Sequence, residues 1–154
     1  MSENLLGTML LVVDGSEPSI AAANYAAQLA AQADARLTAV YVVDTATMEY
    51  LTQMRIFIAE ERQEFEKDLE RTGQRYLDYV RTVARNHGVE AETVQTKGAF
   101  HLTILQMARE IKADLIILGG WHRTITRKDV ASVQRQLILD EADIPVVVVK
   151  RKAS

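Results

Sequence analysis

Asp14 is the side chain of this sequence that is best placed to contact a ligand. It directly follows an apolar run, residues 9–13, and it precedes Gly15. A carboxylate at the end of a buried strand can accept hydrogen bonds from a ligand, and it can equally cap the helix that follows. The sequence leaves both roles open, since one residue can serve both.

A second candidate site lies after another apolar run, residues 115–118. Gly119 and Gly120 allow the backbone to approach a ligand closely, and the next helix presents unpaired N–H groups to an anion. Basic and hydroxyl side chains suited to phosphate follow these glycines: Arg123, Thr124, Thr126, Arg127, Lys128 and Ser132. A solvated basic loop, with Asp129 capping the last helix, fits the same pattern.

Several kinds of catalytic site have no support in the sequence. Cys is absent, which excludes disulfides, thiolate nucleophiles and Cys-type zinc sites. The phosphate-binding patterns G-x-G-x-x-G and G-x-x-x-x-G-K-[ST] are also missing. The three histidines, His87, His101 and His122, show no metal-ligand spacing and are expected on the surface or in loops. We therefore predict no metal site.

Two further catalytic arrangements fail on their own requirements. A Ser132–His122–Asp129 group lacks the strand-to-helix nucleophile motif that would expose its serine, so we predict no catalytic residue. A phospho-accepting receiver domain needs an acid at the end of the third strand, where this chain has Thr96 and Lys97.

Length and composition indicate one domain over residues 1–154. The 154 residues are 48% hydrophobic and 25% charged, which is enough apolar side chain for a core. A net charge of −3 argues against broad binding to nucleic acid or anionic membranes. No segment approaches the roughly 20 apolar residues that span a bilayer, and the N-terminus lacks a basic targeting segment. We therefore expect no membrane insertion and a cytoplasmic location.

Apolar runs alternate with helical patterns along the whole chain. Strands are expected at residues 9–13, 37–43, 91–96, 115–118 and 145–149. Helices are expected at residues 16–33, from 98 to about 111, and after the basic loop up to about residue 143. Residues 48–87 are also expected to be helical, either as one helix or as a short segment followed by a longer helix. Their predicted core positions are Leu51, Met54, Ile58, Phe65, Leu69, Tyr76 and Val80, then Leu102, Leu105, Ala108 and Ile111.

This alternation predicts an α/β fold with an open, doubly wound parallel sheet. Strands that are apolar on both faces are typical of sheets covered by helices on both sides. Ligands of such sheets bind beyond the carboxyl ends of the strands, where the strand order reverses. Asp14 and Gly119 each lie at the carboxyl end of a predicted strand, which is where a ligand of such a sheet would bind.

Three motifs resemble the universal stress protein family: VVDGSEPS at 12–19, DLIILG at 114–119 and PVVVVK at 145–150. VYVVD at 40–44 and Gly98 match further landmarks in the expected order, and the resemblance covers essentially the whole chain. It implies a five-stranded, Rossmann-like parallel sheet of order 3-2-1-4-5, of the adenine nucleotide alpha hydrolase-like kind. It also implies a homodimer through the last strand, Val146, Val147, Val148 and Val149, and an unpaired valine-rich edge suits that role.

The ATP-binding members of this family carry G-x2-G-x9-G-[ST] after the fourth strand, and this chain departs from that pattern. Gly119 matches the first glycine, but His122, Ser132 and Val133 stand at the second glycine, the third glycine and the hydroxyl position. Side chains there would crowd a phosphate chain and restrict the backbone. The phosphate part of the site is therefore degenerate.

The adenine part of the site is retained. By resemblance it uses Asp14 and the backbone near Val43, and both positions match. A one-residue shift of the pattern would place Ala131 and Ser132 on its final Gly-[ST] pair, which keeps the hydroxyl alone. The candidate residues for ATP, ADP or AMP are therefore Asp14, Val43, Gly119, Gly120 and Ser132.

The favoured function is a small dimeric stress-response protein that acts through an unidentified regulatory protein partner, without turnover. One alternative is an ATP, ADP or AMP sensor whose occupancy changes its affinity for that partner. Another is a slow Mg²⁺-dependent ATPase or phosphotransferase. The charged stretch 60–71 is either a solvated helix face or a docking surface, and Trp121 is expected to cover the pocket mouth.

Overall fold

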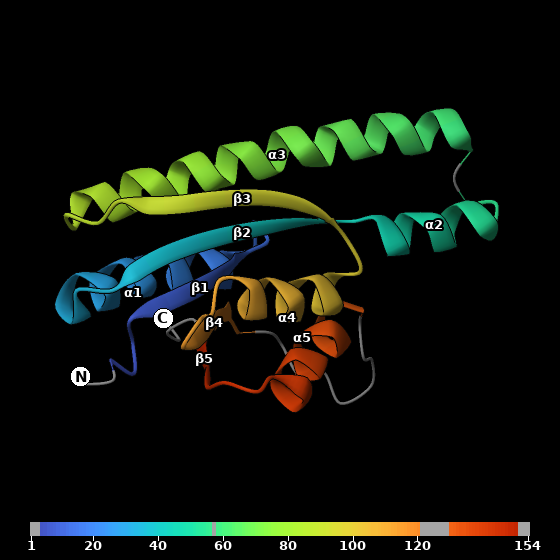
Figure 1. Cartoon of the computed structure of the whole chain (residues 1–154). Coiled ribbons are helices and arrows are strands. Elements are labelled where there is room, and N and C mark those ends of the chain that lie inside the picture. The colour runs from blue at the N-terminus through green and yellow to red at the C-terminus, as the bar shows by residue number, and fades with distance from the viewer. Residues whose placement is uncertain (1–3, 57, 121–129, 151–154) are drawn as a thin grey trace.

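Five parallel strands in the order β3-β2-β1-β4-β5 form the sheet of this protein (Figure 1). The structure is a computed structural model that describes residues 4–56, 58–120 and 130–150. The strands are β1 (Thr8–Val13), β2 (Arg36–Asp44), β3 (Ala91–Gly98), β4 (Leu115–Gly119) and β5 (Val146–Val149). The helices are α1 (Glu17–Ala33), α2 (Thr45–Gln53), α3 (Ala59–Asn86), α4 (Phe100–Glu110) and α5 (Val130–Glu141). This architecture confirms the predicted fold class and strand order.

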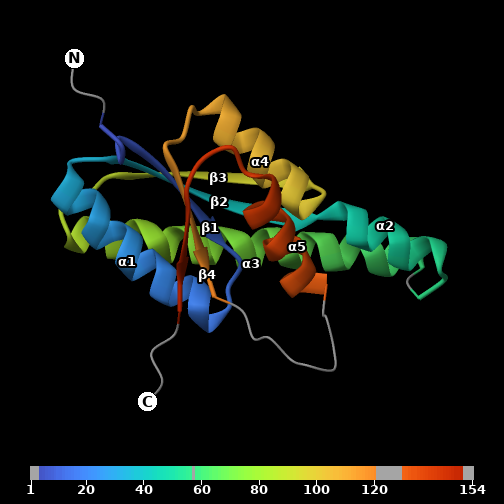
Figure 2. The ribbon, with the colours of Figure 1, turned by 90° about the horizontal axis from the view of Figure 1, so that it is seen from below.

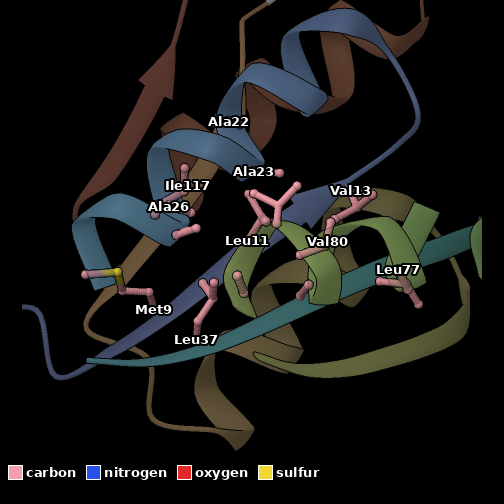
Figure 3. Close-up of a cluster of buried hydrophobic side chains, with 14 of the residues drawn as sticks. Met9, Leu11, Val13, Ala22, Ala23, Ala26, Leu37, Leu77, Val80 and Ile117 are labelled. Atoms are coloured by element: carbon pink, nitrogen blue, oxygen red, sulfur yellow. The ribbon is translucent and has the colours of Figure 1, made fainter. Parts of the chain in front are cut away.

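Helices cover both faces of the sheet, which explains why its strands are apolar throughout. On β1, Met9 and Leu11 pack in a core with α1 and α3, while Leu10 packs in a second core with α4 and α5. Figure 2 shows α4 and α5 on the opposite side of the sheet from α1 and α3. In the first core the small side chains of α1, Ala22, Ala23 and Ala26, let that helix lie close to β1 and β4 (Figure 3).

The long helical segment is two helices, and its first part does not pack as the apolar spacing predicts. Met54 and Ile58 lie at helix ends and are exposed, and Phe65 is exposed on α3. Figure 1 shows the reason, since α2 and the first turns of α3 extend beyond the carboxyl end of the sheet. Deeper along α3, Val80 is buried as predicted and Leu69 and Tyr76 are partly buried, while Leu77 is a buried position that the pattern did not include.

The buried face of α4 also differs from the predicted one. Leu102 is 57% exposed, whereas Ile104, Leu105 and Ala108 are buried. Each step of three residues falls about 60° short of a full turn, so a stripe built from such steps drifts around the helix. Leu102 therefore lies on the outer side, although its spacing from Leu105 is helical.

None of the helices that the structure describes has the length and apolarity needed to cross a membrane.

Candidate functional site

Asp14 lies where the chain leaves β1, at the point where the strand order reverses between β1 and β4. Its Oδ1 accepts hydrogen bonds from the backbone N–H of Ser16 at 2.9 Å and from Ser16 Oγ at 2.6 Å. Ser16, and not Asp14, is the N-cap of α1, because Ser16 Oγ accepts the N–H of Ser19 at 3.3 Å. The prediction that Asp14 could itself cap this helix is therefore wrong, because its Oδ1 instead holds Ser16 in the turn before the helix.

The turn between Asp14 and α1 requires its glycine. Gly15 has φ +82°, a conformation that side chains other than glycine rarely adopt. A Cβ here would also come within 2.5 Å of the Tyr76 ring of α3. The turn that carries Asp14 is thus fixed by both backbone geometry and packing.

Arg135 of α5 forms an ion pair with the second oxygen of Asp14, Oδ2. Both side chains are shielded from water, with 10% of Arg135 and 20% of Asp14 exposed. Burial lowers the pKa of the Arg135 guanidinium from its ordinary value. The guanidinium carbon lies 5.5 Å from the centroid of the Phe100 ring, within cation–π range. Three elements, β1, α4 and α5, therefore meet around one guanidinium.

Arg135 was not among the residues predicted for this site, although the sequence contains a signal for it. Arg135, Ile138 and Ala142 follow one another at spacings of three and four, and the two apolar members pack in the core. A basic residue at an inward position of an apolar stripe is rarely buried without a partner. The partner itself, Asp14, could not be chosen without the fold.

His101 joins the same region. It lies in α4, where its backbone N–H donates to Gln134 Oε1 at 3.1 Å and its Nδ1 lies 2.7 Å from the same oxygen. Its Nε2 lies 3.6 Å from Glu141 Oε2, and only 16% of the side chain is exposed. The expectation of a surface or loop histidine is wrong here, because α5 packs over the start of α4.

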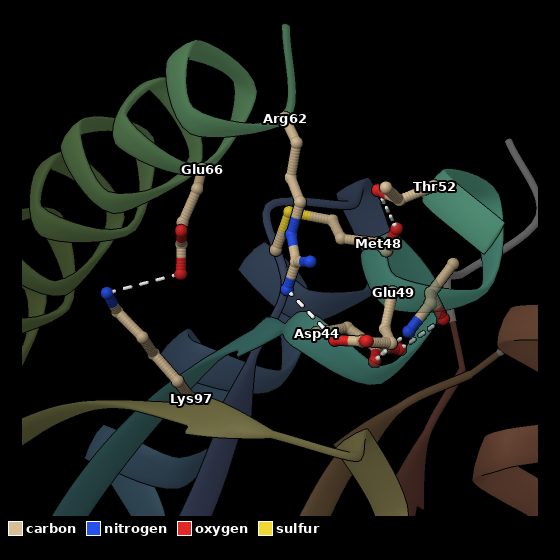
Figure 4. Close-up of polar contacts among 8 residues, drawn as sticks. Asp44, Met48, Glu49, Thr52, Arg62, Glu66 and Lys97 are labelled. Atoms are coloured by element: carbon tan, nitrogen blue, oxygen red, sulfur yellow. Dashed lines mark hydrogen bonds and ion pairs between the residues drawn. The ribbon is translucent and has the colours of Figure 1, made fainter. Parts of the chain in front are cut away.

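A cavity of about 280 Å³ lies beside this contact, between α2 and the start of α4. Its polar and aromatic lining comes from Asp44, Thr47, Tyr50, Phe100, His101 and Gln134. The Asp44 carboxylate is already engaged, because it accepts the N–H of Thr47 at 3.0 Å and its hydroxyl at 2.8 Å, capping α2 (Figure 4). Phe100 lines the cavity and also contacts the Arg135 guanidinium, so cavity and ion pair adjoin.

Val43 is buried in the core, and its backbone belongs to a stretch of β2 that extends past β1. The register between the two strands runs to Val13 and Tyr41, whereas β2 continues to Asp44 beside β3. Backbone N–H and C=O groups of residues 42–44 therefore lie beyond the end of β1, at the edge where Asp14 stands. A paired donor and acceptor of this kind suit the edge of a nitrogen base.

Packing requires a glycine at Gly119, whereas Gly120 continues the strand pairing. A Cβ at Gly119 would lie 2.5 Å from the carbonyl carbon of Pro18 and 2.6 Å from the nitrogen of Ser19. The end of β4 thus touches the first turn of α1, and only glycine permits this approach. The N–H of Gly120 donates to the carbonyl of Val149 at 2.8 Å, continuing the pairing with β5. Their predicted contact with a nucleotide stays a prediction.

Part of the predicted site lies outside the described residues. This holds for the stretch 121–129, which includes Trp121, His122, Asp129 and the basic side chains, and for the side chain of Ser132. Among the residues that are described, no group of three or more His, Asp or Glu could hold a metal ion.

The charged stretch 60–71 lies on α3 and is mostly exposed. Some of its side chains tie neighbouring elements together (Figure 4). Arg62 pairs with Glu49 of α2 at 3.2 Å, and Lys97 of β3 pairs with Glu66 at 3.2 Å and Glu70 at 2.6 Å. Hydrogen bonds to Glu70 and then Glu66 raise the pKa of Lys97. These contacts agree with a solvated face, and a docking role stays a prediction.

Comparison with known proteins gives one consistent family. The profile of the universal stress protein family matches residues 6–150. The universal stress protein MJ0531 of Methanocaldococcus jannaschii is 31% identical over 150 residues, which cover 97% of this chain and 85% of that protein. A solved structure from this family, of Burkholderia pseudomallei, has a TM-score of 0.74 at 24% identity and covers 96% of this chain and 98% of its own.

Two further solved structures that share the fold hold nucleotides. A universal stress protein from Archaeoglobus fulgidus in complex with dAMP has a TM-score of 0.65 at 15% identity, covering 96% of this chain and 100% of its own. A universal stress protein in complex with cAMP has a TM-score of 0.64 at 19% identity, covering 96% and 98%.

Proposed function

This chain belongs to the universal stress protein family, and we propose that it is a regulatory stress protein that acts through a protein partner. In this proposal the region at the carboxyl ends of β1 and β4 corresponds to an adenine-nucleotide site that no longer binds nucleotide. The protein then regulates its partner by binding to it, without catalysing a reaction.

The observation that carries this proposal is the ion pair between Asp14 and Arg135. An adenine amino group would have to compete with the guanidinium for the Asp14 carboxylate. A pair of ionised groups shielded from water is stronger than the bond that a neutral amine offers to the same carboxylate. The free protein is thus expected to keep its crevice closed at cellular nucleotide levels.

The sequence supports the same proposal independently. His122 and Ser132 stand where ATP-binding relatives have glycines, so the phosphates would lose their backbone cradle. A nucleotide would then have to compete with Arg135 at the base site and fit beside side chains at the phosphate site, and both effects weaken binding.

A second candidate function is an ATP, ADP or AMP sensor whose occupancy regulates the partner. It is favoured by the backbone of residues 42–44, which extends past β1 beside Asp14. Two structures that share the fold hold dAMP and cAMP, which supports an adenine ligand in proteins of this architecture.

The assembly proposed is a homodimer through β5. This strand is at one end of the sheet order, and its residues Val146–Val149 are all half-buried. An edge strand of four valines presents both backbone groups and apolar surface to a second copy. The cytoplasmic location stays a prediction.

The proposal is tested by titration calorimetry with ATP, ADP and AMP, each with and without Mg²⁺. The protein is first unfolded and refolded, so that any ligand retained from the cell is removed. We expect no binding heat at millimolar nucleotide, and no release of phosphate above the buffer rate. Micromolar binding would refute the closed crevice and establish the sensor, and Mg²⁺-dependent phosphate release would establish an enzyme.

A further inference from the structure

We propose that Arg135 is a built-in competitor for the base site, because its guanidinium occupies the place on Asp14 that the amino group of an adenine would take. This inference rests on the proposed function and names what closes the crevice. It also names the class of ligand that the crevice takes once Arg135 is removed, a 6-aminopurine nucleotide.

The guanidinium resembles the amino edge of adenine in shape and in hydrogen bonding. Both groups are planar, both donate N–H bonds, and both stack on aromatic rings. In this structure the Arg135 guanidinium forms an ion pair with Asp14 Oδ2, and the guanidinium carbon lies 5.5 Å from the Phe100 ring centroid. A planar donor held between a carboxylate and an aromatic face is the arrangement that a base site would use.

The Asp14 carboxylate is already engaged at both oxygens. Its Oδ1 accepts two bonds from Ser16, at 2.9 and 2.6 Å, and its Oδ2 forms the ion pair with Arg135. An adenine amino group would therefore compete for Oδ2 with a donor that carries a full positive charge.

Tethering favours the internal group. A side chain fixed to α5 competes at an effective concentration that is on the order of millimolar or higher, whatever the cell contains. The apparent affinity for an external base falls by the fraction of molecules whose site is open. Deleting the guanidinium should restore the intrinsic affinity, even with the glycine pattern of the phosphate loop unchanged.

A cavity lies next to the ion pair on the side of Phe100. Its volume is about 280 Å³, and Phe100 lines it, whereas Asp14 and Arg135 are not among its lining residues. The extended backbone of residues 42–44 adds donors and acceptors at the same edge of the sheet.

The carboxylate also sets the choice of base. The 6-amino group of adenine donates to Asp14, whereas the 6-oxo group of hypoxanthine presents an oxygen to it. Two acceptors facing each other repel, so AMP should bind the opened site and IMP should not.

The test compares AMP and IMP binding to the full-length Arg135→Leu protein by calorimetry. Leucine keeps the apolar stem and removes the planar donor. We expect an AMP affinity at least about tenfold above that of the wild type, and no gain for IMP. Adding ethylguanidinium, which restores the missing group from solution, should weaken AMP binding to this variant competitively.

Two matched variants show whether the gain belongs to this pair. Arg109→Leu removes the same type of side chain from the surface of α4, where it lies 3.5 Å from Asp143, and should leave AMP binding as in the wild type. Asp14→Asn added to Arg135→Leu keeps one oxygen for the two Ser16 donors and replaces the other with an NH2 donor, so it should abolish the gain. Should the leucine variant not fold, Arg135→Met gives the same comparison, because methionine keeps an unbranched apolar stem and has no N–H donor.

The outcomes separate this inference from the proposed function. A folded Arg135 variant that binds AMP no better than the wild type overturns the competitor and leaves the closed, partner-directed protein in place. Equal gains for AMP and IMP, or a gain that survives Asp14→Asn, also overturn it. Micromolar AMP binding to the wild type refutes the proposed function itself.

Discussion

Gly119→Ala tests whether this glycine serves packing of α1. The new Cβ would lie 2.5 Å from the Pro18 carbonyl carbon, 2.6 Å from the Ser19 nitrogen and 2.7 Å from the Pro18 oxygen. All three are backbone atoms in the first turn of α1, which Ser16 caps and whose alanines lie in the core. They cannot rotate away as a flexible side chain would, so α1 or β4 must shift.

The expected loss follows from these contacts. Overpacking a well-packed core costs about 1–3 kcal/mol, and three backbone contacts place this case in the upper part of that range. Alanine also restricts the unfolded chain more than glycine does, which raises the free energy of unfolding by about 0.4–1 kcal/mol. The net loss of stability is therefore about 2 kcal/mol. For a domain of this size that is a decrease in Tm of about 4–8 °C.

Denaturation in urea, followed by circular dichroism at fixed protomer concentration, measures this loss. Gly120→Ala is the matched control, because its Cβ would meet Val149 O at 3.3 Å and Lys150 Cα at 3.4 Å, so we expect a loss of less than about 1 kcal/mol. If Gly119→Ala were as stable as the wild type, with the same dependence on urea, the packing explanation would be wrong.

Three further changes test other parts of the structure. Ser16→Ala removes the cap of α1 and should lower the free energy of unfolding by about 1 kcal/mol in urea denaturation; an unchanged midpoint would contradict the role of Ser16 as the cap. Burial, and then the neighbouring Tyr76, raise the pKa of Tyr41, so the free energy of unfolding falls as pH rises above the ordinary tyrosine pKa. In thermal melting at increasing pH, Tyr41→Phe should lose less stability at alkaline pH than the wild type. An equally steep loss in the variant would contradict this role of Tyr41. Val148→Lys places a charge on β5 and should weaken the proposed dimer at least about tenfold in sedimentation, whereas Leu102→Lys on the exposed side of α4 should not; equal effects would argue against a β5 interface.

The fold could be predicted because the apolar pattern of the strands indicates that both faces of the sheet are covered. Residues 9–13 and 115–118 are apolar without alternation, since helices cover both faces of the sheet, and that pattern requires parallel strands with crossovers. Leu102 and Met54 could not be placed in this way, because helical spacing gives a stripe but not the extent of the surface that it packs on.

The site was predicted only in part, for a related reason. Asp14 was found because strand ends at a reversal of strand order are where ligands bind, a rule that depends on topology alone. Its pairing with Arg135 depends on how α5 lies over α4, and short-range patterns carry no information about that. The environment of His101 was missed for the same reason, since its contacts with Gln134 and Glu141 depend on how α5 packs against α4.

Side-chain NMR of the arginines shows whether Arg135 holds Asp14 and closes the base site to nucleotides. The Nε–Hε signal of Arg135 in ¹⁵N-labelled wild-type protein is assigned by its loss in Arg135→Lys and recorded as AMP is added to millimolar concentration. We predict a sharp signal, protected from exchange with water, that AMP does not move. A saturable shift or loss of that signal at micromolar AMP would mean that nucleotide enters the site and that Arg135 does not close it.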